Sequence, residues 1–152
     1  MLHKVVQLGG KSYFWLEKTN VVSMIQEYQV SGFRVREYEE LGSTNTEAER
    51  VGWSELEDKM VILTYRQTQG RGQVGNHWES EPGKNISMTV VFKPRELPAG
   101  QQFAVSMVIA LGTYDFISRY VGECSVKWPN DIYVGDRKIS LSLIHISEPT
   151  RL

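Results

Sequence analysis

This sequence of 152 residues is short of cysteine, of net charge and of long apolar runs. Its single cysteine, Cys124, excludes an intramolecular disulfide and suits a reducing compartment, so we expect a cytoplasmic protein. The net charge is −1, with basic and acidic residues interspersed, and it excludes the broad basic surface that DNA or an anionic membrane attracts. No segment is apolar over the length of a signal peptide or a membrane span. We therefore expect neither nucleic acid nor a membrane as a partner.

The sequence also lacks the residue spacing of a metal site. Its three histidines, His3, His77 and His145, are far apart, and none has a cysteine or a second histidine at ligand spacing. A zinc site is therefore excluded, and we predict no metal held directly by side chains. Magnesium can still arrive with a nucleotide, because phosphate oxygens then supply most of its ligands.

The hydrophobic patterns predict an α+β protein with a mixed β-sheet flanked by helices. Strands are predicted at 32–41 by alternation, at 60–66 by a short apolar run, and at 85–94, where a proline ends the run. The turn residues Gly135 and Asp136 predict a hairpin between 132–134 and 137–139.

Two helices are indicated. Thr44 followed by Glu47 is typical of a capping box, which predicts a helix start at this point. The longest helix is predicted after residue 98, amphipathic and packed on the sheet. Its apolar face is indicated by residues three or four apart: Phe103, Met107, Leu111, Tyr114 and Ile117.

The motif "QTQGRGQVGNHW" (67–78) places Gly70, Gly72 and Gly75 in the pattern G-x-G-x-x-G. A dinucleotide-binding turn would continue into a helix, and none is predicted there. A Walker loop would carry Lys-Ser/Thr at its end, and the companion motifs of a kinase are absent. The glycines still let backbone N–H groups approach an anion, and Arg71 adds a planar fork for a phosphate or carboxylate. The alternative is a surface turn without function.

Two further segments carry polar groups in positions suited to a ligand. Ser43, Thr44 and Asn45 supply hydroxyl and amide groups at a helix start, although a helix N-cap alone would explain them. The segment "KWPND" (127–131) joins a cation, an apolar platform and a carboxylate, although it also suits a simple turn into a hairpin.

Taken together and in this order, these motifs resemble those of biotin–protein ligases, also called holocarboxylase synthetases. The pattern of that family is Ser-Thr-Asn, then Gln-x-x-Gly-Arg-Gly-x-x-Gly-x-x-Trp, then Lys-Trp-Pro-Asn-Asp, then a lysine after a short hairpin, here Lys138. The resemblance covers residues 33–140. It implies a fold akin to class II aminoacyl-tRNA synthetases and lipoate ligases. It also implies that ATP and biotin form biotinoyl-5′-AMP, from which biotin passes to a lysine of a biotin carboxyl carrier domain.

The resemblance also implies roles for individual residues. Arg71, Lys127 and Lys138 would be catalytic, and ATP would bring Mg²⁺ near Asp131. The biotin-binding residues would be Ser43, Thr44, Asn45, Gln67, Arg71, Gly72, Gln73 and Lys138. The nucleotide-binding residues would be Gly70, Arg71, Gly75, Asn76, Trp78, Lys127, Asn130 and Asp131. Gln73 and Asn76 replace arginines that many members carry, so Arg71 would bear more of the anion binding.

The two ends of the chain depart from this family pattern. Residues 1–32 are predicted as an N-terminal extension, and 33–140 as the N-terminal part of the catalytic domain. Residues 141–152 form an atypical tail, so we expect a truncated domain whose sheet is incomplete at its C-terminal side. The alternatives are a lipoate–protein ligase and an inactive fragment that binds only a nucleotide or a partner. A biotin-dependent carboxylase is the expected acceptor, and the sequence leaves homodimerisation open.

Overall fold

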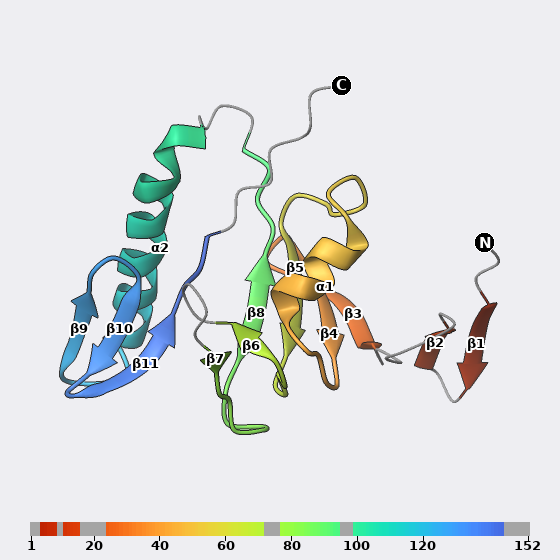
Figure 1. The fold of residues 1–152 in the computed structure, drawn as a ribbon, viewed down its shortest axis with the longest axis horizontal. Helices are drawn as coiled ribbons and strands as arrows, with labels where there is room; N and C mark the ends of the chain where they lie inside the picture. Colours follow the sequence, from red (N-terminus) through yellow and green to blue (C-terminus); the bar gives the residue numbers. More distant parts are fainter. Residues whose placement is uncertain (1–3, 9–10, 16–23, 72–76, 95–98, 145–152) are drawn as a thin grey trace. The chain divides into compact units, whose positions relative to one another are not determined.

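The computed structural model describes residues 4–8, 11–15, 24–71, 77–94 and 99–144 (Figure 1). They fall into two compact units, Met1–Lys93 and Pro94–Leu152, and each is described by itself. The first unit contains β1 (Lys4–Leu8), β2 (Lys11–Trp15), β3 (Met24–Val30), β4 (Phe33–Tyr38), α1 (Thr44–Val51), β5 (Met60–Thr64), β6 (Gly70–Arg71), β7 (His77–Trp78) and β8 (Ser87–Val90). The second contains a short 3-10 helix (Ala99–Gln101), α2 (Gln102–Ile117), β9 (Cys124–Lys127), β10 (Asp131–Val134) and β11 (Arg137–Leu141).

A four-stranded sheet in the order β3-β4-β5-β8 is the centre of the first unit. β4 and β5 are parallel, while β3–β4 and β5–β8 are antiparallel, so the sheet is mixed. The predicted α+β class with a mixed sheet is therefore confirmed. All five residues of β5 are buried, as expected for the apolar run of a strand with a neighbour on each side.

Apolar side chains line both faces of this sheet. On one face, beneath α1, a core cluster consists of Tyr38, Leu41, Ala48, Leu56, Met60, Ile62 and Val91. On the other face Val35, Val61 and Leu63 pack together. α1 packs on β5 and β8 and buries Thr44, Glu47 and Ala48. The helix thus presents the start of its first turn to the sheet, and this places the Ser-Thr-Asn motif above β8.

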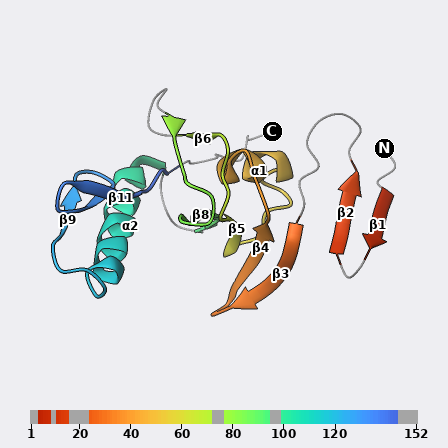
Figure 2. The ribbon, with the colours of Figure 1, turned by 90° about the horizontal axis from the view of Figure 1, so that it is seen from below.

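The sheet begins earlier in the chain than the motifs indicate. β3 lies inside the predicted extension 1–32, yet it pairs with β4 over almost its full length, and Figure 2 shows the two strands side by side. The turn between them consists of Ser31 (φ 49°) and Gly32 (φ 80°), both in the left-handed region that short hairpin turns require. The Ser-Gly pair was the signal for this hairpin in the sequence.

The second unit is a helix on a three-stranded antiparallel sheet in the order β11-β10-β9. The predicted hairpin is confirmed, since β10 and β11 flank a turn at Gly135 with a φ of 54°. α2 packs on β9 and β10. No helix of the described segments is long and apolar enough to span a membrane.

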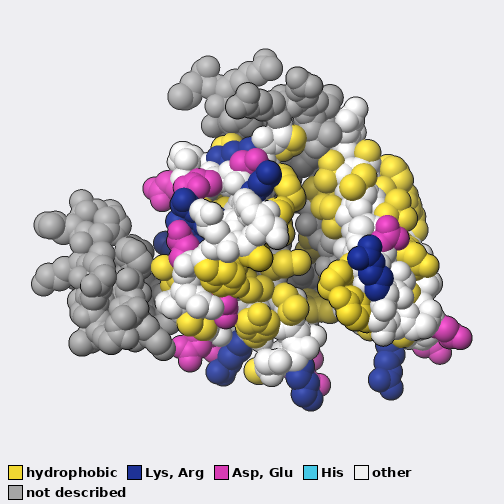
Figure 3. All heavy atoms as spheres, turned by 180° about the vertical axis from the view of Figure 1, so that it is seen from behind, with side chains coloured by type: hydrophobic (Ala, Val, Ile, Leu, Met, Phe, Trp, Pro, Cys, Tyr) yellow, Lys and Arg dark blue, Asp and Glu magenta, His cyan; other side chains and the backbone are white. Residues whose placement is uncertain are grey.

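The predicted apolar face of α2 is wrong in part. Met107, Tyr114 and Ile117 are half-buried, but Phe103 and Leu111 are more than half exposed, and the buried residue is Ala110. The helix is apolar on nearly every side, so residue spacing alone cannot identify the face that packs. Hydrophobic side chains are accordingly visible over α2 in Figure 3, and also over the four-stranded sheet.

Candidate functional site

Two loops that follow neighbouring parallel strands meet beside α1. Leu41, after β4, forms a β-bridge with Gln67, after β5. The N–H of Thr68 donates to the Leu41 carbonyl (2.9 Å), and the N–H of Gln69 donates to the Gly42 carbonyl (2.7 Å). The carboxyl ends of parallel strands lie at one edge of a sheet, which is why these loops come together. Ser-Thr-Asn is thereby placed beside the first residue of the glycine motif.

The start of α1 differs from the predicted capping box. Ser43, not Thr44, is the N-cap residue, and it makes no side-chain capping bond. The Glu47 carboxylate, which a capping box would direct to the N-cap, instead accepts two hydrogen bonds from Arg50, at 2.8 and 2.6 Å. The hydroxyls of Ser43 and Thr44 are therefore not used to cap the helix, although both residues are buried. Helix capping alone does not explain this motif.

Thr44, Asn45 and Gln67 belong to one hydrogen-bonded cluster. The Gln67 amide oxygen accepts from the Thr44 N–H at 3.0 Å. The Thr89 hydroxyl on β8 lies 2.9 Å from the Thr44 hydroxyl and 2.5 Å from the Asn45 amide oxygen. Thr89 was not predicted, because it carries no motif and reaches the cluster only through the sheet. The structure thus joins three predicted biotin-binding residues through one that the sequence did not indicate.

Gly70 occupies a position in which no side chain fits. It pairs with Trp78 across the β6–β7 hairpin, and a Cβ on Gly70 would lie 2.4 Å from the Trp78 carbonyl oxygen. The same Cβ would lie 2.9 Å from the Gln67 amide nitrogen. The backbone of Arg71 pairs with that of His77. The remaining predicted residues of the loop lie outside the described part of the chain: Gly72, Gln73, Gly75 and Asn76.

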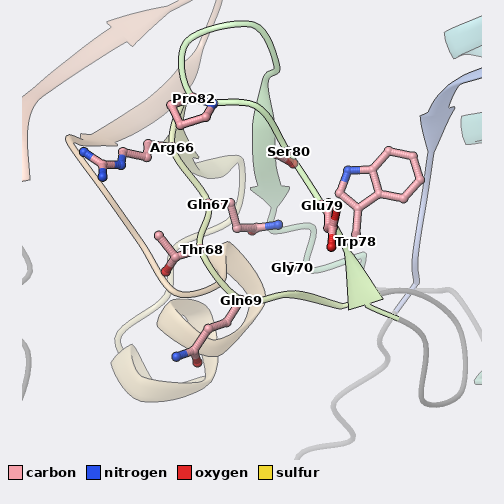
Figure 4. A pocket seen from close by; sticks show the side chains of 9 residues that line it. All are labelled: Arg66, Gln67, Thr68, Gln69, Gly70, Trp78, Glu79, Ser80 and Pro82. Carbon is pink, nitrogen blue, oxygen red and sulfur yellow. The ribbon is translucent and has the colours of Figure 1, made fainter.

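A pocket of about 490 Å³ opens beside this hairpin (Figure 4). It is lined by Arg66, Gln67, Thr68, Gln69, Gly70, Trp78, Glu79, Ser80 and Pro82. In Figure 4 the Gln67 side chain points toward the side of the pocket formed by Trp78 and Ser80. The Ser80 hydroxyl is buried and has no hydrogen-bond partner among the described residues. A buried hydroxyl of this kind is suited to a polar group of a ligand.

The second unit holds the other predicted residues. Asp131 pairs with Lys127 across β9 and β10, and its carboxylate forms an ion pair with the Lys138 ammonium at 2.6 Å. The Lys127 ammonium lies 5.5 Å from the centre of the Tyr133 ring. Asn130 is buried, and its amide donates to the Ser142 carbonyl. The structure therefore brings Lys127, Asp131 and Lys138 together at one end of a hairpin.

Charge is also buried beneath α1. The carboxylate of Glu47 is nearly inaccessible, and its hydrogen bonds raise the pKa of Arg50. Burial, with a further contribution from the negative charge of Glu47, raises the pKa of Tyr38 to about 12. Glu47 and Arg50 of α1 thus interact electrostatically with Tyr38 at the end of β4.

Comparison with known proteins identifies the family. The model of the biotin/lipoate A/B protein ligase family matches residues 38–148, which include all the motifs above. The chain belongs to this family. The matched region also extends into 141–148, which the sequence indicated as an atypical tail.

Relatives of this ligase-family chain are themselves named as ligases. The bifunctional ligase/repressor BirA of Escherichia coli (strain K12) is 28% identical over 96% of this chain and 46% of its own length. The biotin–[acetyl-CoA-carboxylase] ligase of Paracoccus denitrificans is 33% identical over 69% of this chain and 44% of its own length. This chain thus spans less than half the length of these two relatives.

A solved structure supports the fold. The crystal structure of biotin acetyl coenzyme A carboxylase synthetase from Helicobacter pylori with bound biotinylated ATP is similar, with a TM-score of 0.59 and 27% identity. The similarity covers 75% of this chain and 55% of that chain. The mixed sheet flanked by helices is therefore an arrangement that this synthetase, solved with bound biotinylated ATP, also adopts.

Proposed function

We propose that this chain carries the biotin-activating site of a biotin–protein ligase. The observation that supports this most directly is the hydrogen-bonded cluster of Thr44, Asn45 and Gln67 beside Gly70 and the pocket. Biotin carries a ureido head with one carbonyl acceptor and two N–H donors, so a cluster of amides and hydroxyls is complementary to it. The dithiolane head of lipoate offers no such groups, which favours biotin over the lipoate alternative.

The proposed chemistry has two steps. A carboxylate oxygen of biotin attacks the α-phosphorus of ATP, and pyrophosphate leaves, giving biotinoyl-5′-AMP. The amine of a lysine on a biotin carboxyl carrier domain then attacks the anhydride carbonyl, and AMP leaves. In the first step the biotin carboxylate and the α-phosphate of ATP repel one another, because both are anions. Cations and backbone N–H groups must therefore hold them together. Arg71, Lys127 and Lys138 are the cations that we assign to this task.

Magnesium would enter this reaction with ATP. One carboxylate oxygen of Asp131 is paired with Lys138, while the other is buried without a hydrogen-bond partner among the described residues. Those residues contain no group of three or more His, Cys, Asp or Glu that would hold a metal ion by itself. One available carboxylate oxygen fits an ion whose other ligands are phosphates and water. We therefore assign Asp131 as the residue that meets Mg²⁺, which would neutralise phosphate charge.

A biotinylation assay tests the function. The chain is incubated with biotin, ATP–Mg²⁺ and an isolated biotin carboxyl carrier domain, and the acceptor is blotted with streptavidin. Biotin-dependent exchange of labelled pyrophosphate into ATP measures the first step alone. We expect exchange that requires biotin and does not occur with lipoate. Pyrophosphate exchange without biotinylation of the acceptor would limit the chain to adenylate formation. Exchange driven by lipoate would overturn the choice of substrate.

Arg71 is the residue to test first within this proposal. Replacement by alanine removes a charged hydrogen-bonding fork of the kind that contributes about 1.5–3 kcal/mol. We expect Arg71→Ala to release biotinoyl-5′-AMP about tenfold faster or more. Arg71→Lys keeps the charge without the fork, so its rate of biotinoyl-5′-AMP release should lie between those of the wild type and Arg71→Ala. Arg119→Ala, an exposed arginine after α2, serves as the control. Equal release rates from all variants would remove Arg71 from the site.

A further inference from the structure

Thr89 is placed to control the cluster that recognises the ligand. It lies on β8, and its side chain faces α1, whereas its neighbours Met88 and Val90 are exposed on the other face of the sheet. Its hydroxyl contacts both Thr44 (2.9 Å) and Asn45 (2.5 Å), residues more than forty positions earlier in the chain.

The number of hydroxyl protons determines which group donates and which accepts in each hydrogen bond of this cluster. A hydroxyl has one proton, and an amide oxygen can only accept. Thr89 must therefore donate its proton to the Asn45 amide oxygen, at 2.5 Å. In its 2.9 Å contact with Thr44, Thr89 is then the acceptor, and the Thr44 hydroxyl is the donor. The Thr44 hydroxyl has no second proton for the Gln67 oxygen 3.5 Å away, which accepts instead from the Thr44 N–H.

This order determines which ends of the two amides remain for a ligand. The oxygen of Asn45 is held by Thr89, and the oxygen of Gln67 is held by the backbone of Thr44. The NH₂ group of Gln67 is turned toward Gly70, where it lies 2.9 Å from the position of a Cβ. Among the described residues, the NH₂ groups are thus the ends of both amides that remain for a ligand, and NH₂ groups donate.

We propose that Thr89 is a positioning residue that orients the Asn45 amide, so that the cluster presents hydrogen-bond donors to the carbonyl oxygen of the ureido head. This inference rests on the proposed function, because it names biotin as the ligand. Without the hydroxyl, the Asn45 oxygen loses its donor and the amide is free to rotate, which would turn an acceptor toward an acceptor. Thr89 itself need not touch biotin.

Matched variants of the full chain test the role of Thr89. Thr89→Val keeps the β-branched shape on a strand and removes the hydroxyl, whereas Thr89→Ser keeps the hydroxyl. The control is Thr113→Val, which removes the same group from α2, where it donates to the Ile109 carbonyl at 2.8 Å. Thr89→Ala repeats the deletion with a smaller side chain, and circular dichroism and thermal unfolding verify that each variant is folded.

The measurements are the Kd of biotin by titration calorimetry and the KM values of biotin and ATP in pyrophosphate exchange. We expect Thr89→Val to raise the Kd and KM of biotin about tenfold, the effect of one lost hydrogen bond and a misdirected amide. The KM of ATP should change less than about twofold. Thr89→Ser should restore biotin binding, and Thr113→Val should match the wild type.

Two results would overturn the positioning role alone. One is an unchanged Kd of biotin in both Thr89→Val and Thr89→Ala. The other is a parallel rise in the KM of biotin and of ATP, which indicates a general structural defect. A wild-type chain that binds no biotin would overturn the proposed function as well, so the two failures are distinguishable.

Discussion

Gly70 is the residue whose identity the structure explains most fully. It lies between the Trp78 backbone and the Gln67 amide, and a Cβ would approach a carbonyl oxygen to 2.4 Å. Backbone cannot move as a flexible side chain does, so Gly70→Ala must open the β6–β7 hairpin. We expect a loss of about 1–3 kcal/mol in the free energy of unfolding, as for other overpacked sites. Biotin binding should fall at the same time, because Gln67 is displaced.

A second glycine of the same region provides the control for stability. A Cβ on Gly42 would lie 3.5 Å from the Gln69 side-chain oxygen, an ordinary contact distance. Gly42→Ala should therefore change the free energy of unfolding by less than about 0.5 kcal/mol. Urea denaturation of both variants measures the difference, and equal stabilities would show that the hairpin adapts to a side chain at Gly70.

At the scale of elements, the buried carboxylate of Glu47 on α1 interacts with Tyr38 at the end of β4. Tyr38 is buried among apolar side chains, and the Glu47–Arg50 ion pair lies beside it. Burial disfavours the phenolate, so the pKa of Tyr38 is raised from its ordinary value of about 10 to about 12. This contribution to stability is fully present below about pH 10 and is lost as the pH rises through about 12.

The variant Tyr38→Phe isolates this pH dependence. Between pH 9 and pH 12 the wild type should lose roughly 2 kcal/mol more free energy of unfolding than Tyr38→Phe, since phenylalanine has no proton to release. Chemical denaturation at several pH values gives both curves. Tyr120→Phe changes an exposed tyrosine and should follow the wild type. Parallel curves for wild type and Tyr38→Phe would contradict the buried, protonated state of Tyr38.

Replacement by alanine should change stability in opposite directions at two glycines that lie in different elements. Gly112 lies inside α2 with nothing within 4 Å of a Cβ, so Gly112→Ala should stabilise by about 0.5–1 kcal/mol through helix propensity. Gly135 has a φ of 54° in the β10–β11 turn, so Gly135→Ala should destabilise by about 1 kcal/mol. Urea denaturation measures both, and changes of the same sign would contradict the backbone argument.

The elements also show where sequence patterns succeed and fail. The turn at Gly135 and the apolar run of β5 were predicted, because each depends on neighbours in the chain. The capping box was not formed, because the Thr44 hydroxyl bonds to β8 and Glu47 bonds to Arg50. Thr44 and Glu47 thus have partners that spacing alone does not reveal, and tertiary contacts override the local pattern.

For the whole molecule, a small net charge and exposed apolar side chains both favour association between molecules. The net charge is −1 and the isoelectric point is about 6.3, so repulsion between molecules is small near neutral pH. Met88 on β8 and Leu111 on α2 are more than half exposed. Figure 3 shows hydrophobic side chains on the surface of the molecule. We expect solubility to be lowest near pH 6.3 and to rise toward pH 8.5.

Light scattering across this pH range measures the effect on solubility. Met88→Glu adds a negative charge at an exposed apolar position and should reduce scattering near neutral pH without a large change in stability. Glu123→Gln, which removes a negative charge from the exposed segment before β9, should have the opposite effect. Scattering that does not depend on pH would show that charge has no part in association.

The sequence by itself determined the family, the order of the motifs, the α+β class and the strands β4, β5, β8, β10 and β11, because these depend on residue type and local spacing. Only the tertiary structure decided that Ser-Thr-Asn lies beside Gln67, that β3 belongs to the sheet, and that Thr89 joins the cluster. The physical reason is the parallel pairing of β4 and β5, which brings two distant loops to one edge of the sheet. A hydrogen bond between residues more than forty positions apart produces no periodic pattern in the sequence. The role of Thr89 could therefore be inferred only from the structure, in which β8 pairs with β5.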